Sequence, residues 1–320
     1  MRVGQNPAKY VKEVAKPARI TVAVLNYIPF LSGFYAEMMD VLKACLGSIW
    51  QNTDLPYDLM VFDNGSCGEV RQYLLDEHEA GKIQFLLLSE KNMGKGGAWN
   101  FILDGAPGEL IAYTDNDCYF HPGWLSRSVQ LLEAYPKTGM VTARPFRTNP
   151  DYYSNSIAWG EQTPGVMLER GQFIPWEVFK EFDLSLGQSE EEIRQHYEAT
   201  QDVRLNYQGV PAILGASHWQ FLARKEVLAQ FLPFSMDRPM GQVKQLDARM
   251  NEAGYLRLMP TDPLAMNMSN TLRTLRVPGL VSSTAERART GKNNTLLDFP
   301  PVKRTLLSLY DAIFRWYYDR

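Results

Sequence analysis

Short apolar runs alternate with segments of helical periodicity in the first half of the chain, and this alternation constrains the fold more than any other feature. The apolar runs, each bounded by turn-forming residues, cover residues 20–25, 59–62, 83–88, 110–114 and 139–143. Such runs are typical of buried strands. Strands that alternate with helices favour a parallel sheet covered on both faces. The sequence therefore predicts an α/β fold with a mostly parallel central sheet flanked by helices.

Polar side chains follow the carboxyl ends of four of these predicted strands. They are Asn26 after the first, Asp63, Asn64 and Ser66 after the second, Asn92, Gly94 and Lys95 after the third, and Asp115, Asn116 and Asp117 after the fourth. In an open α/β sheet the carboxyl ends of parallel strands meet at one edge, which is where ligands bind. The sequence therefore predicts a binding site at this edge.

The acidic pair Asp115 and Asp117 suggests the chemistry of that site. Two hard oxygen ligands at this spacing suit Mg²⁺ or Mn²⁺, which also hold substrate phosphates. Taken alone, such a pair is more often solvated or caps a turn. The neighbouring polar turns are what favour a metal and phosphate site.

Composition excludes several functional classes. A formal net charge of -3 and a pI near 5.9 provide no basic field for nucleic acid. The three cysteines lack metal-site spacing and indicate a reducing compartment. The polar segment 1–18 lacks the apolar core of a signal peptide, and no window is long enough to span a bilayer. We expect a soluble, cytoplasmic protein.

The second half of the chain has weaker periodicity. Residues 148–202 are rich in Pro, Gly, Tyr, Trp and Glu. The elements predicted beyond residue 188 are a helix over 189–200, a strand over 212–223 interrupted at 215–219, a helix over 225–231, a helix over 242–253, a strand over 255–259 and an amphipathic helix over 302–318.

Several linked motifs resemble the family 2 glycosyltransferases of the GT-A fold. The motifs are residues 20–26, Val61-Phe-Asp-Asn-Gly-Ser66, Asn92-Met-Gly-Lys-Gly-Gly-Ala-Trp-Asn100, and Asp115-Asn-Asp117 with Pro122-Gly-Trp124. Their order and spacing match over residues 19–147, and blocks 215–218 and 248–255 match more loosely. The resemblance implies a GT-A type nucleotide-diphospho-sugar transferase fold. After an N-terminal extension (1–18), it implies a nucleotide-sugar-binding half (19–147), an acceptor-binding half (148–270) and a C-terminal tail (271–320).

The resemblance also implies a function, namely metal-dependent transfer of a sugar from a nucleoside-diphosphate sugar, with UDP favoured, to an acceptor hydroxyl with inversion. The acceptor class covers glycans, lipid-linked molecules and other hydroxyl compounds. Asp115 would contact the ribose or, through water, the metal, and Asp117 would bind a Mn²⁺ or Mg²⁺ that bridges the phosphates. The donor-binding set implied is Asn26, Asp63, Asn64, Ser66, Asn92, Gly94, Lys95, Asp115 and Asn116.

Two of these donor-side residues leave alternatives open. Asp63 could accept the imide N–H of uracil, or it could serve only a turn. Lys95 could offset diphosphate charge, or it could be a solvated lysine.

Three positions depart from the family pattern or are less specific. The catalytic base is expected at Asp247, although the usual Glu-Asp dipeptide is missing, and the alternative is a helix-surface carboxylate paired with a neighbouring basic residue. Asn267 stands where many relatives have a His that binds the metal or contacts the diphosphate, and its amide oxygen is expected to be a weaker metal ligand. His218 and Trp219 could line the acceptor pocket or belong to the core.

Two other functional classes compete with this assignment. A sugar nucleotidyltransferase needs a glycine-rich loop after the first strand, where residues 26–33 contain one glycine and a proline. A non-catalytic sugar-nucleotide or glycan-binding module would account for the missing Glu-Asp pair. For the tail helix over 302–318, packing on its own domain, homodimer formation and peripheral membrane contact are the three alternatives.

Overall fold

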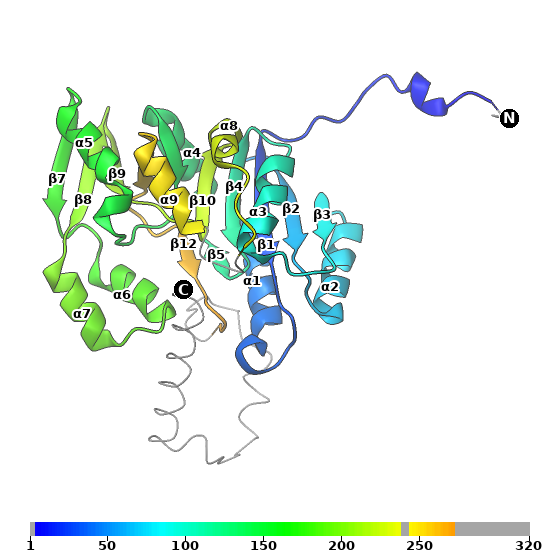
Figure 1. Cartoon of the computed structure of the whole chain (residues 1–320), viewed down its shortest axis with the longest axis horizontal. Coiled ribbons are helices and arrows are strands. Elements are labelled where there is room, and N and C mark those ends of the chain that lie inside the picture. Colours follow the sequence, from blue (N-terminus) through cyan, green and yellow to red (C-terminus); the bar gives the residue numbers. More distant parts are fainter. Residues whose placement is uncertain (1–3, 238–242, 273–320) are drawn as a thin grey trace, which may run out of the picture. The chain divides into compact units, whose positions relative to one another are not determined.

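The computed structural model describes residues 4–237 and 243–272, all of which belong to the compact unit Met1–Leu280 (Figure 1). The tail helix predicted over 302–318 lies outside the described residues. Within the described ranges, no helix has the length and apolar character needed to cross a bilayer.

The first four strands form the parallel part of the central sheet, as predicted. These strands are β1 (Ile20–Asn26), β2 (Tyr57–Asp63), β3 (Phe85–Leu88) and β4 (Leu110–Asp115), arranged in the order β3-β2-β1-β4. The helices that alternate with them are α1 (Met38–Asn52), α2 (Gly68–Glu79), α3 (Gly94–Gly105) and α4 (Trp124–Ala134).

Side chains of β1 alternate between two cores, one on each face of the sheet. Val22 and Val24 pack with α1, α2 and α4, whereas Ala23 and Leu25 pack with α3. All seven residues of β1 are buried. A strand buried on both faces needs the continuous apolar run that its sequence shows.

The second half of the chain extends this sheet with antiparallel pairs and makes it mixed. The added strands are β6 (Thr138–Val141), β7 (Val166–Gly171), β8 (Asp202–Tyr207), β9 (Val210–Leu214), β10 (Gln220–Arg224) and β11 (Leu256–Met259), in the order β4-β10-β6-β11-β9-β8-β7. Strands β8 and β9 form a hairpin around Gln208 and Gly209, which both have positive φ. This is the backbone geometry of a tight two-residue hairpin turn, which makes β8 and β9 antiparallel neighbours. The pairing of β6 with β11 is parallel.

The remaining described elements are not part of the ten-stranded sheet. They are α5 (Ser154–Gln162), α6 (Trp176–Ser185), α7 (Glu190–Ala199), α8 (Lys225–Leu228), α9 (Val243–Glu252), four 3₁₀ helices (Pro7–Tyr10, Gly33–Tyr35, Pro150–Tyr152 and Ala229–Phe231), and a small antiparallel pair of β5 (Cys118–Phe120) with β12 (Ala265–Asn267). The predicted helices α7 and α9 are confirmed. Helices α5 and α6 and strands β7 and β8 were not predicted.

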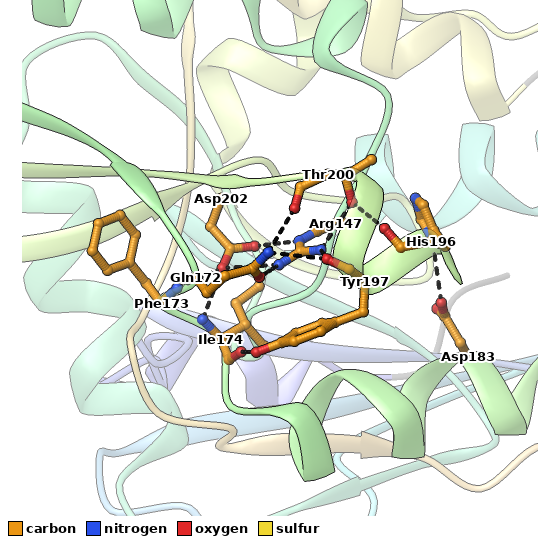
Figure 2. Close-up of polar contacts among 9 residues, drawn as sticks. All are labelled: Arg147, Gln172, Phe173, Ile174, Asp183, His196, Tyr197, Thr200 and Asp202. Atoms are coloured by element: carbon orange, nitrogen blue, oxygen red, sulfur yellow. Dashed lines mark hydrogen bonds and ion pairs between the residues drawn. The ribbon is translucent and has the colours of Figure 1, made fainter. Parts of the chain in front are cut away.

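A buried ion pair anchors the α6 and α7 segment to strand β8. Figure 2 shows Arg147 facing Asp202, with an Arg147 Nε to Asp202 Oδ1 distance of 2.6 Å. Asp202 Oδ2 accepts the backbone N–H groups of Phe173 and Ile174 at 2.7 and 2.8 Å. Arg147 also donates to the carbonyl oxygen of Tyr197 at 2.8 Å. The loop before α6, the end of α7 and β8 are therefore held by one charge pair.

Candidate active site

A buried polar network links the carboxyl ends of β1, β2 and β4. The amide of Asn26 donates to Asp63 at 2.8 Å and to Ser66 at 3.0 Å, and Asn116 donates to Asn26 at 2.7 Å. The Ser66 backbone N–H donates to the second oxygen of Asp63 at 3.1 Å. The predicted residues of three strands are thus brought together. Asp63 is fully buried, so in this structure its carboxylate braces the turn after β2.

Asn64 and Asn92 join the turn after β2 to the start of α3. Asn64 Nδ2 donates to Asn92 Oδ1 at 3.0 Å, and Asn92 Oδ1 also accepts the Gly94 N–H at 2.8 Å. Gly65 has a left-handed φ of 88°, and a Cβ there would lie 3.1 Å from the backbone nitrogen of Asn92. Only glycine suits this close approach of two turns.

The sequence predicts a glycine-rich turn over residues 92–97 that leads into a helix over 98–103, but in the structure these glycines form the first turn of α3. Helix α3 begins at Gly94. A Cβ on Gly97 would lie 3.0 Å from the terminal carbon of Met236. Gly97 therefore makes room for a neighbouring side chain.

Lys95 lies against the first acidic residue of the site. Its Nζ is 2.6 Å from Asp115 Oδ2, and the Tyr113 hydroxyl donates to Asp115 Oδ1 at 2.5 Å. The Lys95 side chain is 13% exposed, which rules out the solvated-lysine alternative. Both oxygens of Asp115 are therefore hydrogen-bonded within the protein.

Asp117 is placed differently from its partner carboxylate. Burial, reinforced by the negative charge of Asp115, raises the pKa of Asp117 to about 7, although Lys95 opposes the shift. No side chain among the described residues donates a hydrogen bond to its carboxylate. Asp117 is thus a carboxylate whose negative charge is poorly compensated.

Asn267 reaches the acidic turn through the small β5 and β12 pair. It pairs with Cys118, and the N–H of Met268 donates to the carbonyl oxygen of Asp117 at 2.7 Å. The Asn267 side-chain oxygen accepts the Ser269 N–H at 2.7 Å. The amide oxygen retains a lone pair for a ligand, but in this structure it stabilises a turn.

The donor set fits a divalent cation that takes most of its ligands from phosphates. Among the described residues no three His, Cys, Asp or Glu side chains cluster as a complete metal site. Mg²⁺ is commonly held by one or two carboxylates together with substrate phosphate oxygens and water. Asp115 and Asp117 supply two carboxylates, and burial, together with the charge of Asp115, raises the pKa of Asp117, so a cation would stabilise its ionised form.

Asp247 is buried and is not on the exposed surface of its helix. Arg257 Nη2 lies 2.5 Å from Asp247 Oδ1, and His218 Nδ1 lies 2.6 Å from Asp247 Oδ2. Burial lowers the pKa of Arg257, and the charge of Asp247 opposes that shift. The alternative of a surface carboxylate paired with a neighbouring basic residue of its helix is therefore wrong.

A cavity of about 540 Å³ is lined by His218 and by Asn267 of the β5 and β12 pair. Its volume is that of a small-molecule site. The residues in its wall include Phe146, Phe182, Trp219, Arg147, Asp183, His196, His218, Lys244 and Asn267. Both predicted acceptor residues, His218 and Trp219, therefore line it.

Trp219 contributes its ring to the wall of this cavity. Its ring packs against Phe146 and Phe182, with centroids 6.0 and 5.6 Å apart. Its indole N–H is buried and has no hydrogen-bond partner among the described residues. A buried indole N–H ordinarily finds an acceptor.

Arg257 and Tyr113 are parts of the site that the sequence analysis missed. A lone arginine in the apolar strand Leu256–Met259 was a usable signal, because a buried guanidinium requires a carboxylate partner. Tyr113 gave no such signal, since aromatic residues are common in strands.

Comparison with known proteins assigns part of the chain to a family. Residues 33–179 match the family model described as glycosyl transferase family 2. A glycosyltransferase of Haloferax volcanii, AglE, is 25% identical over 34% of this chain and 36% of its own length. An uncharacterized glycosyltransferase of Nostoc sp., alr2836, is 25% identical over 38% of this chain and 35% of its own. The chain thus spans about a third of the length of these curated relatives.

Two solved structures resemble the fold. The mannosyltransferase PcManGT of Pyrobaculum calidifontis, solved with GDP-Man and Mn²⁺, has a TM-score of 0.47 and 18% identity and covers 92% of this chain and 72% of its own. Residues 1–349 of TarS from S. aureus give a TM-score of 0.45 and 12% identity over 78% of this chain and 59% of that one. The α/β architecture and the family match agree with the GT-A type expected from the sequence.

Proposed function

Residues 33–179 belong to glycosyl transferase family 2, and from that premise we propose that this protein transfers a sugar from a nucleoside-diphosphate sugar, with a UDP-sugar favoured, to an acceptor hydroxyl with inversion. The observation that carries the proposal is the acidic turn. Asp115 and Asp117 lie where β4 ends, beside the polar turns of β1 and β2.

Different residues of the site would bind the phosphates and the nucleoside of the donor. Lys95 and the start of α3 lie beside the acidic turn and would interact with the phosphates. Bound between Asp117 and the diphosphate, Mn²⁺ or Mg²⁺ would neutralise charge on the leaving group. The turn after β2, with Asn64, would receive the nucleoside.

The cavity at His218 and Trp219 is the proposed acceptor site. It offers the aromatic side chains of Phe146, Phe182 and Trp219 together with the polar groups of His218, Lys244 and Asn267. Apolar faces with a few hydrogen-bonding groups suit a hydroxyl-bearing acceptor such as a sugar ring.

A donor panel tests this function. UDP-glucose, UDP-GlcNAc, GDP-mannose and dTDP-glucose are added with and without Mn²⁺, and melting temperature and released nucleoside diphosphate are measured. A donor that binds only the folded state stabilises it by mass action and so raises the melting temperature. At a donor concentration a hundred times its Kd, the free energy of unfolding increases by about 2.7 kcal/mol. We expect at least one donor to bind in the presence of Mn²⁺ and to release its nucleoside diphosphate.

The same panel separates the competing functions. Binding without release of nucleotide by any donor would indicate a binding module. Release of pyrophosphate from a nucleoside triphosphate and a sugar phosphate would indicate a nucleotidyltransferase. Failure of every donor to bind would contradict the proposal.

A further inference from the structure

The buried position of Asp247 argues against direct contact with an acceptor. The side chain is 4% exposed, and each carboxylate oxygen already has a close partner, Arg257 on one side and His218 on the other. A general base must lie within hydrogen-bond reach of the proton that it removes. In this structure Asp247 meets that condition only toward His218.

His218, unlike Asp247, is accessible from the cavity. Its side chain is 23% exposed and lines the cavity. An ionised carboxylate can only accept hydrogen bonds, so the contact with Asp247 places the imidazole proton on Nδ1. Neutral His218 then carries its lone pair on Nε2, for which the described residues provide no hydrogen-bond partner.

The loop that carries His218 is attached to the acidic turn. The backbone N–H of Asp115 donates to the carbonyl oxygen of Trp219, the residue after His218, at 2.9 Å. The Thr142 hydroxyl accepts the Ser217 N–H at 2.8 Å on the other side of His218. The imidazole is therefore held between two anchored residues, next to the proposed donor site.

We propose that His218 is the general base of the transfer reaction and that Asp247 is its positioning residue, a proposal that rests on the proposed glycosyltransferase function. The acceptor hydroxyl gives its proton to His218 Nε2 as its oxygen bonds to the anomeric carbon. The bond from that carbon to the diphosphate breaks, and the diphosphate leaves with the electron pair. Asp247 stabilises the imidazolium that forms, and Arg257 holds Asp247 in place.

Histidine tautomers provide a test that does not depend on turnover. The chain has four histidines, so ¹⁵N-histidine NMR can resolve His218 by comparison with His218→Gln. We expect the Nδ1–H form in the wild-type protein at about pH 8. The Nε2–H form in the wild-type protein would overturn the proposal.

Asp247→Asn should invert that tautomer. Arg257 is only a donor, so the oxygen of the new amide must face Arg257 and its NH₂ must face His218. His218 Nδ1 then accepts, and Nε2 becomes protonated and useless as a base. An unchanged tautomer in this variant would show that Asp247 does not position the ring.

Kinetic measurements complete the test. They use the donor that binds most tightly in the panel, and water takes the place of the acceptor. We expect His218→Gln to lower kcat for donor hydrolysis by about 10²- to 10⁴-fold, with donor KM unchanged. Added imidazole should partly restore His218→Ala. His78→Gln is the matched control, because the hydrogen bond that the described residues provide for its ring joins it to the carbonyl oxygen of Ile83, on the α2 side of the sheet.

The outcomes separate the two proposals. Near-normal turnover in His218→Gln, together with loss in Asp247→Asn, would make Asp247 the base and overturn the inference while leaving the transferase function intact. A wild-type protein that neither binds nor hydrolyses any donor contradicts the function itself, and the tautomer measurement then still decides whether Asp247 orients His218.

Discussion

The two carboxylates of the acidic turn experience different electrostatic environments although only one residue separates them. Asp115 receives Lys95 and the Tyr113 hydroxyl. No side chain in the described part of the chain donates to Asp117 in this way, and burial raises its pKa to about 7. Retaining a poorly compensated charge costs stability, and such groups concentrate at functional sites. This asymmetry favours Asp117 as the main metal ligand.

Asp117→Asn should stabilise the metal-free protein while it abolishes efficient transfer. The pKa of Asp117 rises from 3.8 to about 7 on folding. Between these values the folded state holds a proton that the unfolded chain has released, so stability falls as the pH rises through this window and stays lower above it. At about pH 8 without divalent cations, we expect the variant to melt at least about 2 °C higher than wild type.

The control for this prediction is the same comparison near pH 4 and in the presence of donor and Mn²⁺. The stability difference should shrink near pH 4, where both states begin to hold the proton. With donor and Mn²⁺, the melting temperature of the wild type should rise more than that of the variant. The turnover of the variant should be about 10²- to 10³-fold lower than that of the wild type. A variant with full activity in Mn²⁺ would remove the metal role of Asp117.

The buried pair of Asp247 and Arg257 should show strong energetic coupling. Asp247→Ala leaves Arg257 buried without its counter-charge, which should cost about 3–5 kcal/mol in the free energy of unfolding. Arg257→Met additionally leaves the carbonyl oxygens of Tyr152 and Ala216 without their donor. Urea denaturation of both single variants and the double variant forms a cycle. We expect the double variant to lose clearly less free energy of unfolding than the two single variants lose together. Additive losses would contradict a direct charge pair.

At the scale of single elements, the α6 and α7 segment should depend on the Arg147 and Asp202 pair. Arg147→Met removes the donor that joins Asp202 to the end of α7 (Figure 2). We expect faster amide hydrogen exchange over residues 172–200 and unchanged exchange in β1 and β4. Arg170→Met, which breaks an exposed ion pair with Glu161, is the matched control and should change neither region.

Elements with strong local periodicity were predictable, and those that depend on distant partners were not. Strand β1 and helix α1 show their periods directly in the sequence. Helix α3 was expected four residues too late, because its first turn consists largely of glycines, which have low helix propensity. The insertion of β10 between β4 and β6 is a non-local pairing that no local pattern encodes.

The residues of the candidate site likewise include some that the sequence predicts and some whose environment it does not. The donor-side residues were predictable because each follows a strand, and strand ends meet at one edge. The environment of Asp247 was not, since burial and the contact with His218, 29 residues earlier, exist only in the folded chain. Side-chain spacing on a helix could only suggest partners within one or two turns.

At the scale of the whole molecule, one sheet joins both halves of the described chain. Strand β10, from the proposed acceptor half, pairs with β4 and β6 on its two sides. The proposed donor and acceptor sites are therefore attached to one hydrogen-bonded ladder. The division into a donor half (19–147) and an acceptor half (148–270) stays a prediction.

Removal of residues 301–320 should leave donor chemistry intact, because every residue of the proposed site lies between Asn26 and Asn267. The measurements are donor hydrolysis and the melting-temperature gain with donor and Mn²⁺, each compared with the full chain. Light scattering on the same samples tests homodimer formation, one of the three alternatives for the tail helix. A dimer would lose half its mass, and an unchanged oligomeric state would exclude that role. Lost hydrolysis would instead mean that the tail completes the active site, in which case residues outside the described ranges belong to the catalytic unit.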